Sequence, residues 1–379
     1  MRNLIRGAGI LALAAGAGFL TPAAIVEAAD ADAAGPAQAA FVQTNDPSGN
    51  AIVAYRRNAD GTLTPGGTYP TGGRGGKELP GTQSDPLGSQ GSLVYDAAHR
   101  LLLAVNAGSD SVSVFRVDGD RLELSQVLAS GGAFPTGIAL HGNLVYVLDA
   151  GLAGFVSGYR IQGQSLQPIP GSTRTLGLPN TDPPFFLSSP GEIGFTPSGG
   201  QLLVTTKANG TVDVFAVSTG GQLSAQPVRN PEGPVPFAFT FEPAGLLTLV
   251  NAGASSVGTF RVERNGTLTP AGAPVSDGQV AACWIVSLRE FDYVANTGSG
   301  DVSQYRVSGD GSVTLVNPAA ASGIPGAIDM ASAAGRFLYV ESGSSGSVDV
   351  FAVAPAGSLT LIQSVAVPDG GSLEGIVAG

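Results

Sequence analysis

The feature that most constrains this chain is a strand–turn–strand unit that recurs seven times. Each copy aligns on one aromatic residue in its second strand, and these residues are Tyr55, Phe115, Tyr159, Phe215, Phe260, Tyr305 and Phe351. Four of the six spacings between them are 44 to 46 residues, and the other two are 60 and 56. A period of this length predicts one supersecondary unit per copy, each packed on its neighbours.

Within each copy, apolar and polar positions alternate with a period of two, which is typical of antiparallel strands. An apolar strand such as 101–105 precedes a tight turn, and a second turn often places glycine before leucine, as at 61–63 and 357–359. A further strand opens each unit, for example "PTGIAL" and "PGEIGF". Four strands per copy predict an all-β fold, a seven-bladed β-propeller of four-stranded antiparallel blades.

The two ends of the repeat region predict how the ring closes. The first copy starts at 40–44 without an opening strand, and a spare strand follows the last copy at 372–377. We therefore expect the C-terminal strand to pair into the N-terminal blade, so that residues 40–379 form a single domain. Closure of this kind removes the two end faces that an open stack of blades would expose.

The N-terminus has the pattern of a secretory signal peptide. Arg2 and Arg6 precede an uncharged run over 7–26, and Val26-Glu27-Ala28 offers the small residues that a signal peptidase requires. We expect cleavage after Ala28, a flexible segment over 29–39, and a secreted or extracellular protein with no membrane attachment after cleavage. An uncleaved membrane anchor is the alternative interpretation.

Charge and cysteine content limit the partners and the means of stabilisation. The formal net charge is −11, which argues against nucleic acid and anionic membranes as partners. A small molecule, a glycan or a protein is the expected partner. The single cysteine, Cys283, cannot form an intramolecular disulfide, so burial and strand pairing must stabilise the fold.

Two connections between blades are longer than the others, and both join the last strand of one blade to the first strand of the next. They cover 65–91 and 168–190, and in a propeller such connections lie on one face. Long loops on a rigid scaffold often bind ligands. The candidate ligand-binding residues on them are Arg74, Lys77, Arg174, Phe185 and Phe186. Tolerated surface insertions are the alternative, with the two phenylalanines anchoring their loop.

The start of each innermost strand lies closest to the ring axis. The third position of these strands is small in five of six aligned blades, and Glu192 is the one carboxylate there. A carboxyl among apolar strands can have a raised pKa and act as a base, so Glu192 is the candidate catalytic residue. A salt bridge or a solvated rim position is the alternative. Asp329 is a further candidate ligand-binding residue near the same level.

No motif calls for a metal or a cofactor, and we assign none. The two histidines, His99 and His141, lie in turns between first and second strands, on the face opposite the long connections. A Ser-His-Asp arrangement or a histidine zinc site would need a histidine elsewhere. A calcium site at the channel mouth stays open, although no loop has calcium-loop spacing.

The units "YVANTGSGDVSQYRV", "LLAVNAGSDSVSVFRV" and "FLYVESGSSGSVDVFAV" resemble the repeats of lactonase-like seven-bladed propellers, which include 6-phosphogluconolactonase, carboxymuconate cyclase and the Tyr-Val-Thr-Asn surface repeats. The resemblance covers 41–379 and implies the propeller fold. Members that look catalytic begin certain inner strands with Pro-Arg-His. This chain has Pro190-Gly191-Glu192 and Pro236-Phe237-Ala238 there, so neither Arg nor His carries over, and hydrolysis of a phosphorylated lactone is not expected.

Three functions stay open. The first is a non-catalytic exported propeller that binds its partner on the face carrying the 65–91 and 168–190 loops. The second is a hydrolase of an uncharged lactone, in which Glu192 positions or activates water. The third is a structural module of the cell wall or surface.

Overall fold

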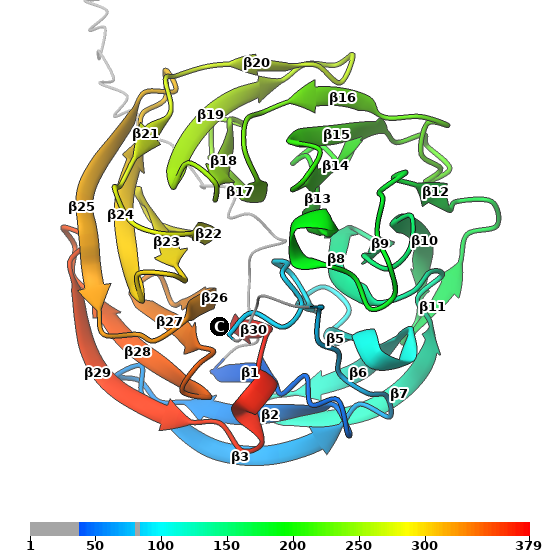
Figure 1. The fold of residues 1–379 in the computed structure, drawn as a ribbon. Helices are drawn as coiled ribbons and strands as arrows, with labels where there is room; N and C mark the ends of the chain where they lie inside the picture. The colour runs from blue at the N-terminus through cyan, green and yellow to red at the C-terminus, as the bar shows by residue number, and fades with distance from the viewer. Residues whose placement is uncertain (1–37, 80–83) are drawn as a thin grey trace, which may run out of the picture.

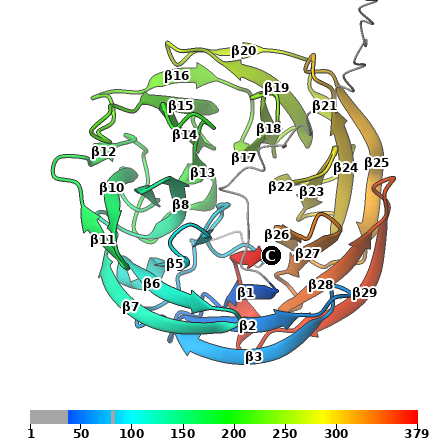
Figure 2. The same ribbon diagram turned by 180° about the vertical axis from the view of Figure 1, so that it is seen from behind.

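The computed structural model describes residues 38–79 and 84–379, which form seven antiparallel β-sheets around a central channel (Figure 1; Figure 2 shows the opposite face). The predicted all-β seven-bladed propeller is confirmed. The predicted signal peptide at 1–28 lies outside the described residues, as does most of the segment at 29–39.

The blades follow one another along the chain, and each runs from the axis to the rim. Blade 1 contains β30 (Ile376–Ala378), β1 (Ala39–Gln43), β2 (Ala51–Arg57) and β3 (Leu63–Pro70). Blade 2 contains β4 (Leu93–Asp96), β5 (Leu101–Asn106), β6 (Ser111–Asp118) and β7 (Arg121–Ala129), with a 3₁₀ turn η1 (Ala107–Ser109). Blade 3 contains β8 (Pro135–His141), β9 (Leu144–Asp149), β10 (Phe155–Gln162), β11 (Ser165–Pro168) and β12 (Arg174–Thr175).

The remaining four blades repeat this order. After η2 (Phe186–Ser188), blade 4 contains β13 (Pro190–Phe195), β14 (Gln201–Thr206), β15 (Thr211–Ala216) and β16 (Val228–Pro231). Blade 5 contains β17 (Pro236–Phe241), β18 (Leu247–Asn251), β19 (Ser256–Val262), β20 (Leu268–Pro270) and β21 (Val275–Ser276). Blade 6 contains β22 (Ala282–Leu288), β23 (Phe291–Asn296), β24 (Asp301–Val307) and β25 (Val313–Ser322). Blade 7 contains β26 (Ala327–Ala333), β27 (Phe337–Ser342), β28 (Ser347–Val353) and β29 (Leu359–Ala366), and η3 (Gly370–Ser372) follows it.

The ring closes as the sequence predicts, because β30 pairs antiparallel with β1 and supplies the innermost strand of blade 1. The strand is shorter and later than the predicted 372–377. Residues 370–372 form η3, and Gly375 has a φ of +119°, a conformation that only glycine adopts easily. The regular strand therefore begins only after Gly375, although Glu374 and Gly375 already exchange backbone hydrogen bonds with Gln43.

The seven aligned aromatic residues all lie in the third strand of their blade and are all buried. Neighbouring blades are also joined by a recurring hydrogen bond from a second-strand tyrosine to a glycine carbonyl in the outer turn of the next blade. Tyr146, Tyr293 and Tyr339 donate to Gly221, Gly357 and Gly61 at 2.8, 2.7 and 2.9 Å. These three glycines have positive φ, which explains the glycine before leucine in the repeat. The bond from Tyr339 crosses the closure between blades 7 and 1.

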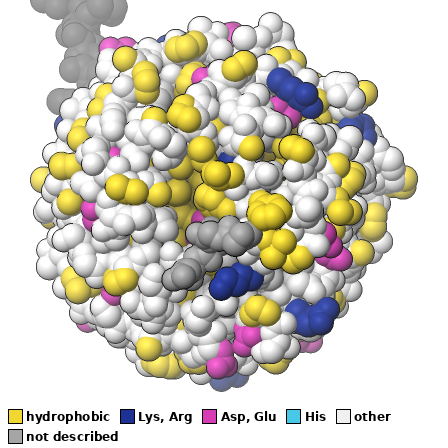
Figure 3. All heavy atoms as spheres, in the orientation of Figure 1, with side chains coloured by type: hydrophobic (Ala, Val, Ile, Leu, Met, Phe, Trp, Pro, Cys, Tyr) yellow, Lys and Arg dark blue, Asp and Glu magenta, His cyan; other side chains and the backbone are white. Residues whose placement is uncertain are grey.

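The two long connections lie on the face seen in Figure 1 and contact each other. The backbone N–H of Leu79 donates to the carbonyl of Pro184 at 2.7 Å. The second connection is partly ordered as strand, because β12 continues the outer edge of blade 3 beside β10. In Figure 3, which views this face, hydrophobic side chains gather around the centre of the ring.

Candidate functional site

A cavity of about 550 Å³ occupies one half of the central channel. The innermost strands of every blade except blade 3 line it, and it extends to the first-to-second-strand turns that carry the exposed residues Pro243 and Arg289. These turns lie on the face opposite the long connections. The sequence predicts binding on the long-connection face, whereas this cavity lies at the other end of the channel.

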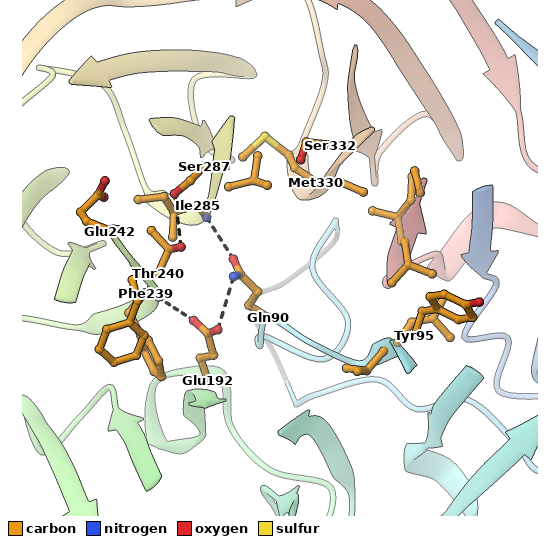
Figure 4. A pocket seen from close by; sticks show the side chains of 18 of the residues that line it. Gln90, Tyr95, Glu192, Phe239, Thr240, Glu242, Ile285, Ser287, Met330 and Ser332 are labelled. Carbon is orange, nitrogen blue, oxygen red and sulfur yellow. Dashed lines mark hydrogen bonds between the residues drawn. The ribbon is translucent and has the colours of Figure 1, made fainter. Parts of the chain in front are cut away.

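Glu192 and Gln90 lie at the inner end of this cavity (Figure 4). The innermost strand of each blade has no partner on its axial side, so some of its N–H groups face the channel. The Glu192 carboxyl accepts one of these, from Phe239, at 2.6 Å. The Gln90 side chain accepts another, from Ile285, at 3.0 Å and donates to Glu192 at 3.4 Å. The two side chains thus link blades 4, 5 and 6 across the channel.

The environment of Glu192 favours the protonated carboxyl. Burial raises the pKa of Glu192 well above its ordinary value, and the nearby Asp329 raises it further. The N–H of Phe239 and the amide of Gln90 lower it by a smaller amount. A carboxyl that keeps its proton is a hydrogen-bond donor and can act as a general acid, whereas the sequence alone suggests a base at this position.

The other half of the channel is filled by the end of the first long connection. The Glu374 carboxyl, just before β30, accepts the N–H groups of Leu87 and Ser89 at 2.6 and 3.3 Å. The Lys207 ammonium donates to the carbonyl of Gly88 at 2.7 Å, and the N–H of Gln90 donates to Gly191 at 2.9 Å. Residues 85–90, which we call the plug, therefore separate the cavity from the long-connection face.

Buried carboxyl groups lie in the plug and around it. Asp85 belongs to the plug, and the groups around it are Glu78, Asp329, Glu341 and Glu374. Burial raises the pKa of each, to about 8 for Glu78, about 6 for Asp85 and about 7 for Asp329. The Lys207 ammonium opposes this shift at Glu78 and Asp85, where it lowers the pKa, but the effect of burial is larger.

Lys207 is itself held between aromatic rings. Its ammonium lies 3.9 Å from the ring centre of Phe186 and 5.1 Å from that of Phe237. The Phe237 ring in turn lies 4.8 Å from the ring of Trp284. Cation–π contacts of this kind are strongest where water is excluded, and Lys207 is 1 % exposed.

The structure brings three of the sequence-predicted residues to the channel. Glu192 lines the cavity, Asp329 is buried close to Glu192 and the plug, and Phe186 packs on Lys207. Phe185 is 43 % exposed, which leaves it outside this group although it is next to Phe186.

The other three predicted residues lie away from the channel. Arg74 and Lys77 are exposed on the surface of the first long connection. Arg174, in β12, donates to the carbonyls of Leu223 and Ser224 at 2.6 and 2.9 Å, and to two carbonyls of its own loop. Its guanidinium joins the outer edges of blades 3 and 4, which is a structural role.

Close packing explains why the inner strands lack the Pro-Arg-His pattern. A side chain at Gly191 would begin 2.7 Å from the carbonyl oxygen of Phe237, which leaves no room for arginine. The corresponding place in blade 5 is filled by Phe237, which stacks between Lys207 and Trp284. The inner ends of these strands thus present a carboxyl and aromatic rings.

Sequence reasoning missed Gln90 and Lys207 as channel residues. Gln90 ends a connection with no repeat period, and only its position three residues before the inner strand of blade 2 suggests that it lies near the axis. Lys207 follows the apolar strand β14 directly, at a turn that faces the channel. A lysine at this turn, next to the long connections, is the one sequence feature that could have indicated a role for Lys207 in the channel.

Within 38–79 and 84–379, no group of three or more His, Cys, Asp or Glu residues is arranged to hold a metal ion. Across the same residues, no helix is long and apolar enough to cross a membrane.

Comparisons with known proteins give matches only among solved structures. No protein-family model matches the chain, and no curated protein matches its sequence. The periplasmic gluconolactonase PpgL of Pseudomonas aeruginosa superposes with a TM-score of 0.69 at 21 % identity, over 90 % of this chain and 99 % of that one. A candidate 6-phosphogluconolactonase from Bacteroides uniformis gives 0.67 at 17 % identity, over 89 % and 98 %. Another from Bacteroides fragilis gives 0.64 at 20 %, over 89 % and 97 %.

All three identities are low, so these likenesses concern the fold. They agree with the repeat pattern and with the ring closure described above. The chain therefore has the seven-bladed propeller fold of the lactonase-like proteins.

Proposed function

We propose that the protein is an exported propeller that binds a small uncharged molecule in the channel cavity. The observation that carries this proposal is the cavity itself, of about 550 Å³, with the paired Gln90 and Glu192 side chains at its inner end. Cavities of this size, mostly apolar with a few convergent polar groups, are typical ligand sites. A protonated Glu192 and the amide of Gln90 offer hydrogen bonds without a net charge.

The ligand is expected to be the size of a five- or six-membered lactone or a cyclic polyol. A phosphorylated ligand would need clustered basic groups. Arg289 is the one basic side chain among the lining residues, and it already donates to the carbonyl of Ala354 at 3.2 Å. The lining therefore favours neutral ligands over sugar phosphates.

The test is a thermal-shift and calorimetric screen of neutral lactones, lactams and cyclic polyols. Binding to the folded state at 100 times Kd should stabilise it by about 2.7 kcal/mol. The variant Ser332→Phe places a ring in the cavity and should abolish the shift, because Ser332 lines its wall. The matched control Thr360→Phe changes an exposed position on the rim strand β29 and should retain it. Equal shifts in both variants would contradict binding in the cavity.

A second function, hydrolysis of a neutral lactone, is supported by the position of Glu192 in the cavity wall. PpgL, whose fold matches over most of both chains, is described as a gluconolactonase. In this reaction water adds to the lactone carbonyl, the ring C–O bond breaks, and the ring oxygen leaves as a hydroxyl. Glu192 would donate its proton to the ring oxygen as it leaves, and the proton that the attacking water loses would return to the Glu192 carboxylate.

The enzyme assay uses wild type, Glu192→Gln and Ser332→Phe on the lactones that bind. Hydrolysis that falls about 100-fold in Glu192→Gln, while binding stays, would support the acid role. Binding without hydrolysis above the spontaneous rate would support the binding function and contradict the hydrolase function. N-terminal sequencing of protein recovered outside the cytoplasm tests export, which requires a mature chain beginning at residue 29.

A further inference from the structure

One wall of the cavity, between blades 5 and 6, carries hydroxyl and carboxyl side chains. Thr240 and Ser287 project toward each other there, and Glu242 lies beside them at the end of β17 (Figure 4). Behind this wall lie Thr248 on β18 and Asp292 on β23, of which Asp292 is 2 % exposed. Neither Thr248 nor Asp292 is among the residues that line the cavity.

The hydrogen-bond partners of the hydroxyls in this wall indicate which group donates in each contact. The Ser287 hydroxyl lies 2.6 Å from Asp292 Oδ1 and donates to it. A serine has one proton to donate, so the 3.2 Å contact between Thr240 and Ser287 must be donated by Thr240. On the other side, the Thr248 hydroxyl donates to Glu242 Oε1 at 2.8 Å.

The two carboxyl groups complete the network. Burial raises the pKa of Asp292 well above its ordinary value, and the nearby Glu242 raises it further. Asp292 Oδ2 has no hydrogen-bond partner among the described residues, so Oδ1 is the oxygen that connects this carboxyl to the wall. The hydroxyl protons of Thr240 and Ser287 thus point away from the cavity, toward Asp292. The oxygen lone pairs of Thr240 and Glu242 that face the cavity remain as acceptors.

We propose that Thr240 and Glu242 form a specificity wall that selects ligands carrying a hydrogen-bond donor, a hydroxyl or an N–H, toward blades 5 and 6. Asp292 is the positioning residue, because it orients Ser287 and through it Thr240 without reaching the cavity. This inference rests on the proposed binding function and deepens it. It also predicts that ligands presenting only acceptors to this wall, such as ethers, carboxylates or phosphates, are rejected.

Selectivity arises because a donor and an acceptor on the ligand have unequal effects on the free energy of binding. A donor on the ligand satisfies acceptors that the cavity has removed from water, whereas an acceptor or a methyl group in the same place leaves them unpaired. Sites built to bond a ligand hydroxyl discriminate strongly against analogues that lack it. We expect loss of the relevant donor to weaken binding by about 10-fold or more.

The probes are D-glucono-1,5-lactam and its monodeoxyfluoro analogues, since fluorine keeps the size of a hydroxyl and removes the donor. Calorimetric titration of wild-type protein should show one analogue bound about 10-fold more weakly than the parent. In Thr240→Val, which is nearly isosteric, that difference should disappear. In the matched control Thr360→Val, which changes an exposed position on the rim strand β29, it should remain.

Two further variants separate positioning from general packing. Asp292→Asn keeps an acceptor for Ser287, so it should preserve the discrimination between parent and fluorinated probes. Asp292→Leu removes this acceptor and should erase the discrimination, even where the folded state survives in a thermal melt. Equal affinity of all fluorinated probes in wild type, or an unchanged difference in Thr240→Val, would overturn the specificity wall while binding stands. No binding by any probe, including the neutral lactones, would overturn the proposed function as well.

Discussion

The backbone N–H of Leu87 donates to the carboxyl of Glu374 at 2.6 Å, although 287 positions separate the two residues in the chain. Through this bond, the segment that closes the ring also holds the plug in the channel. Closure and the inner end of the cavity are therefore one structural unit, and changes to the C-terminal segment should affect both.

Deletion of residues 372–379 should lower the melting temperature by about 10 °C or more. The deletion exposes the inner edge of β1, removes the buried side chains of Leu373 and Ile376, and removes the Glu374 carboxyl from the plug. Burial of each aliphatic side chain contributes about 1.5–3 kcal/mol. Calorimetry measures the shift. Among point variants, Ile376→Ala should destabilise more than Val377→Ala, whose side chain is only half-buried. An unchanged melt in the deletion would contradict closure by β30.

Stability should fall as the pH rises from about 5 to 8. Burial raises the pKa of Glu78 to about 8, of Asp329 to about 7 and of Asp85 to about 6, so the folded chain keeps protons that the unfolded chain releases near pH 4. A raised folded-state pKa gives stability that is present at acid pH and lost as pH rises through the folded value. Thermal melts should show a decrease of several degrees.

The variant Glu78→Gln provides the check on this pH dependence. Its amide can still bond Ser189, which contacts the carboxyl in the wild type, but it does not titrate. Its melting temperature should depend less on pH between 5 and 8 than that of the wild type. A wild-type melt that rises over this range would mean that the carboxyl groups are ionised in the folded state.

Lys207→Met should destabilise the protein by about 1–3 kcal/mol. Methionine can occupy the space between the Phe186 and Phe237 rings, but the carbonyl of Gly88 loses its donor. Loss of the ammonium also raises the pKa of Glu78 and Asp85 further, because it lowers both in the wild type. Denaturant unfolding measures the change. The control Lys77→Met alters an exposed lysine and should stay within about 0.5 kcal/mol.

Arg174→Lys should reduce stability by about 1 kcal/mol and leave ligand binding unchanged. A lysine ammonium cannot reproduce the bonds that the guanidinium donates to Leu223 and Ser224 together. The exposed Arg74→Lys is the matched control, and neither property should change in it. Weaker binding of a cavity ligand in Arg174→Lys, at equal stability, would return this residue to the list of ligand-binding candidates.

The repeat explains how much of the fold could be predicted from the sequence. Strands that alternate with a period of two in each copy determine which face of a blade is buried, so the seven aromatic positions and the ring follow from the pattern. Ring closure follows from one missing and one spare strand. The shift of β30 to residue 376 could not be predicted, because it depends on the local turn at Gly375.

The site was less predictable, because its side chains come from the parts of the chain that do not repeat. Glu192 could be singled out because it breaks a row of small residues at the start of the inner strands. The plug has no periodicity, so nothing in the sequence indicated that residues 85–90 enter the channel. The long connections were expected to overhang the ligand site, whereas the cavity proposed here as that site opens at the other end of the channel.

The innermost strand of blade 1 has a consequence for the synthesis of the protein. Residues 376–378 are synthesised after all the other described strands of the propeller, whereas their partner β1 is synthesised before them. During translation the inner edge of β1 therefore stays unpaired, and the apolar face of blade 1 stays uncovered. Chains can aggregate through both surfaces. A circular permutant that begins at β30 and continues into β1 would complete its first blade early, and its folding yield in a cell should exceed that of the natural order.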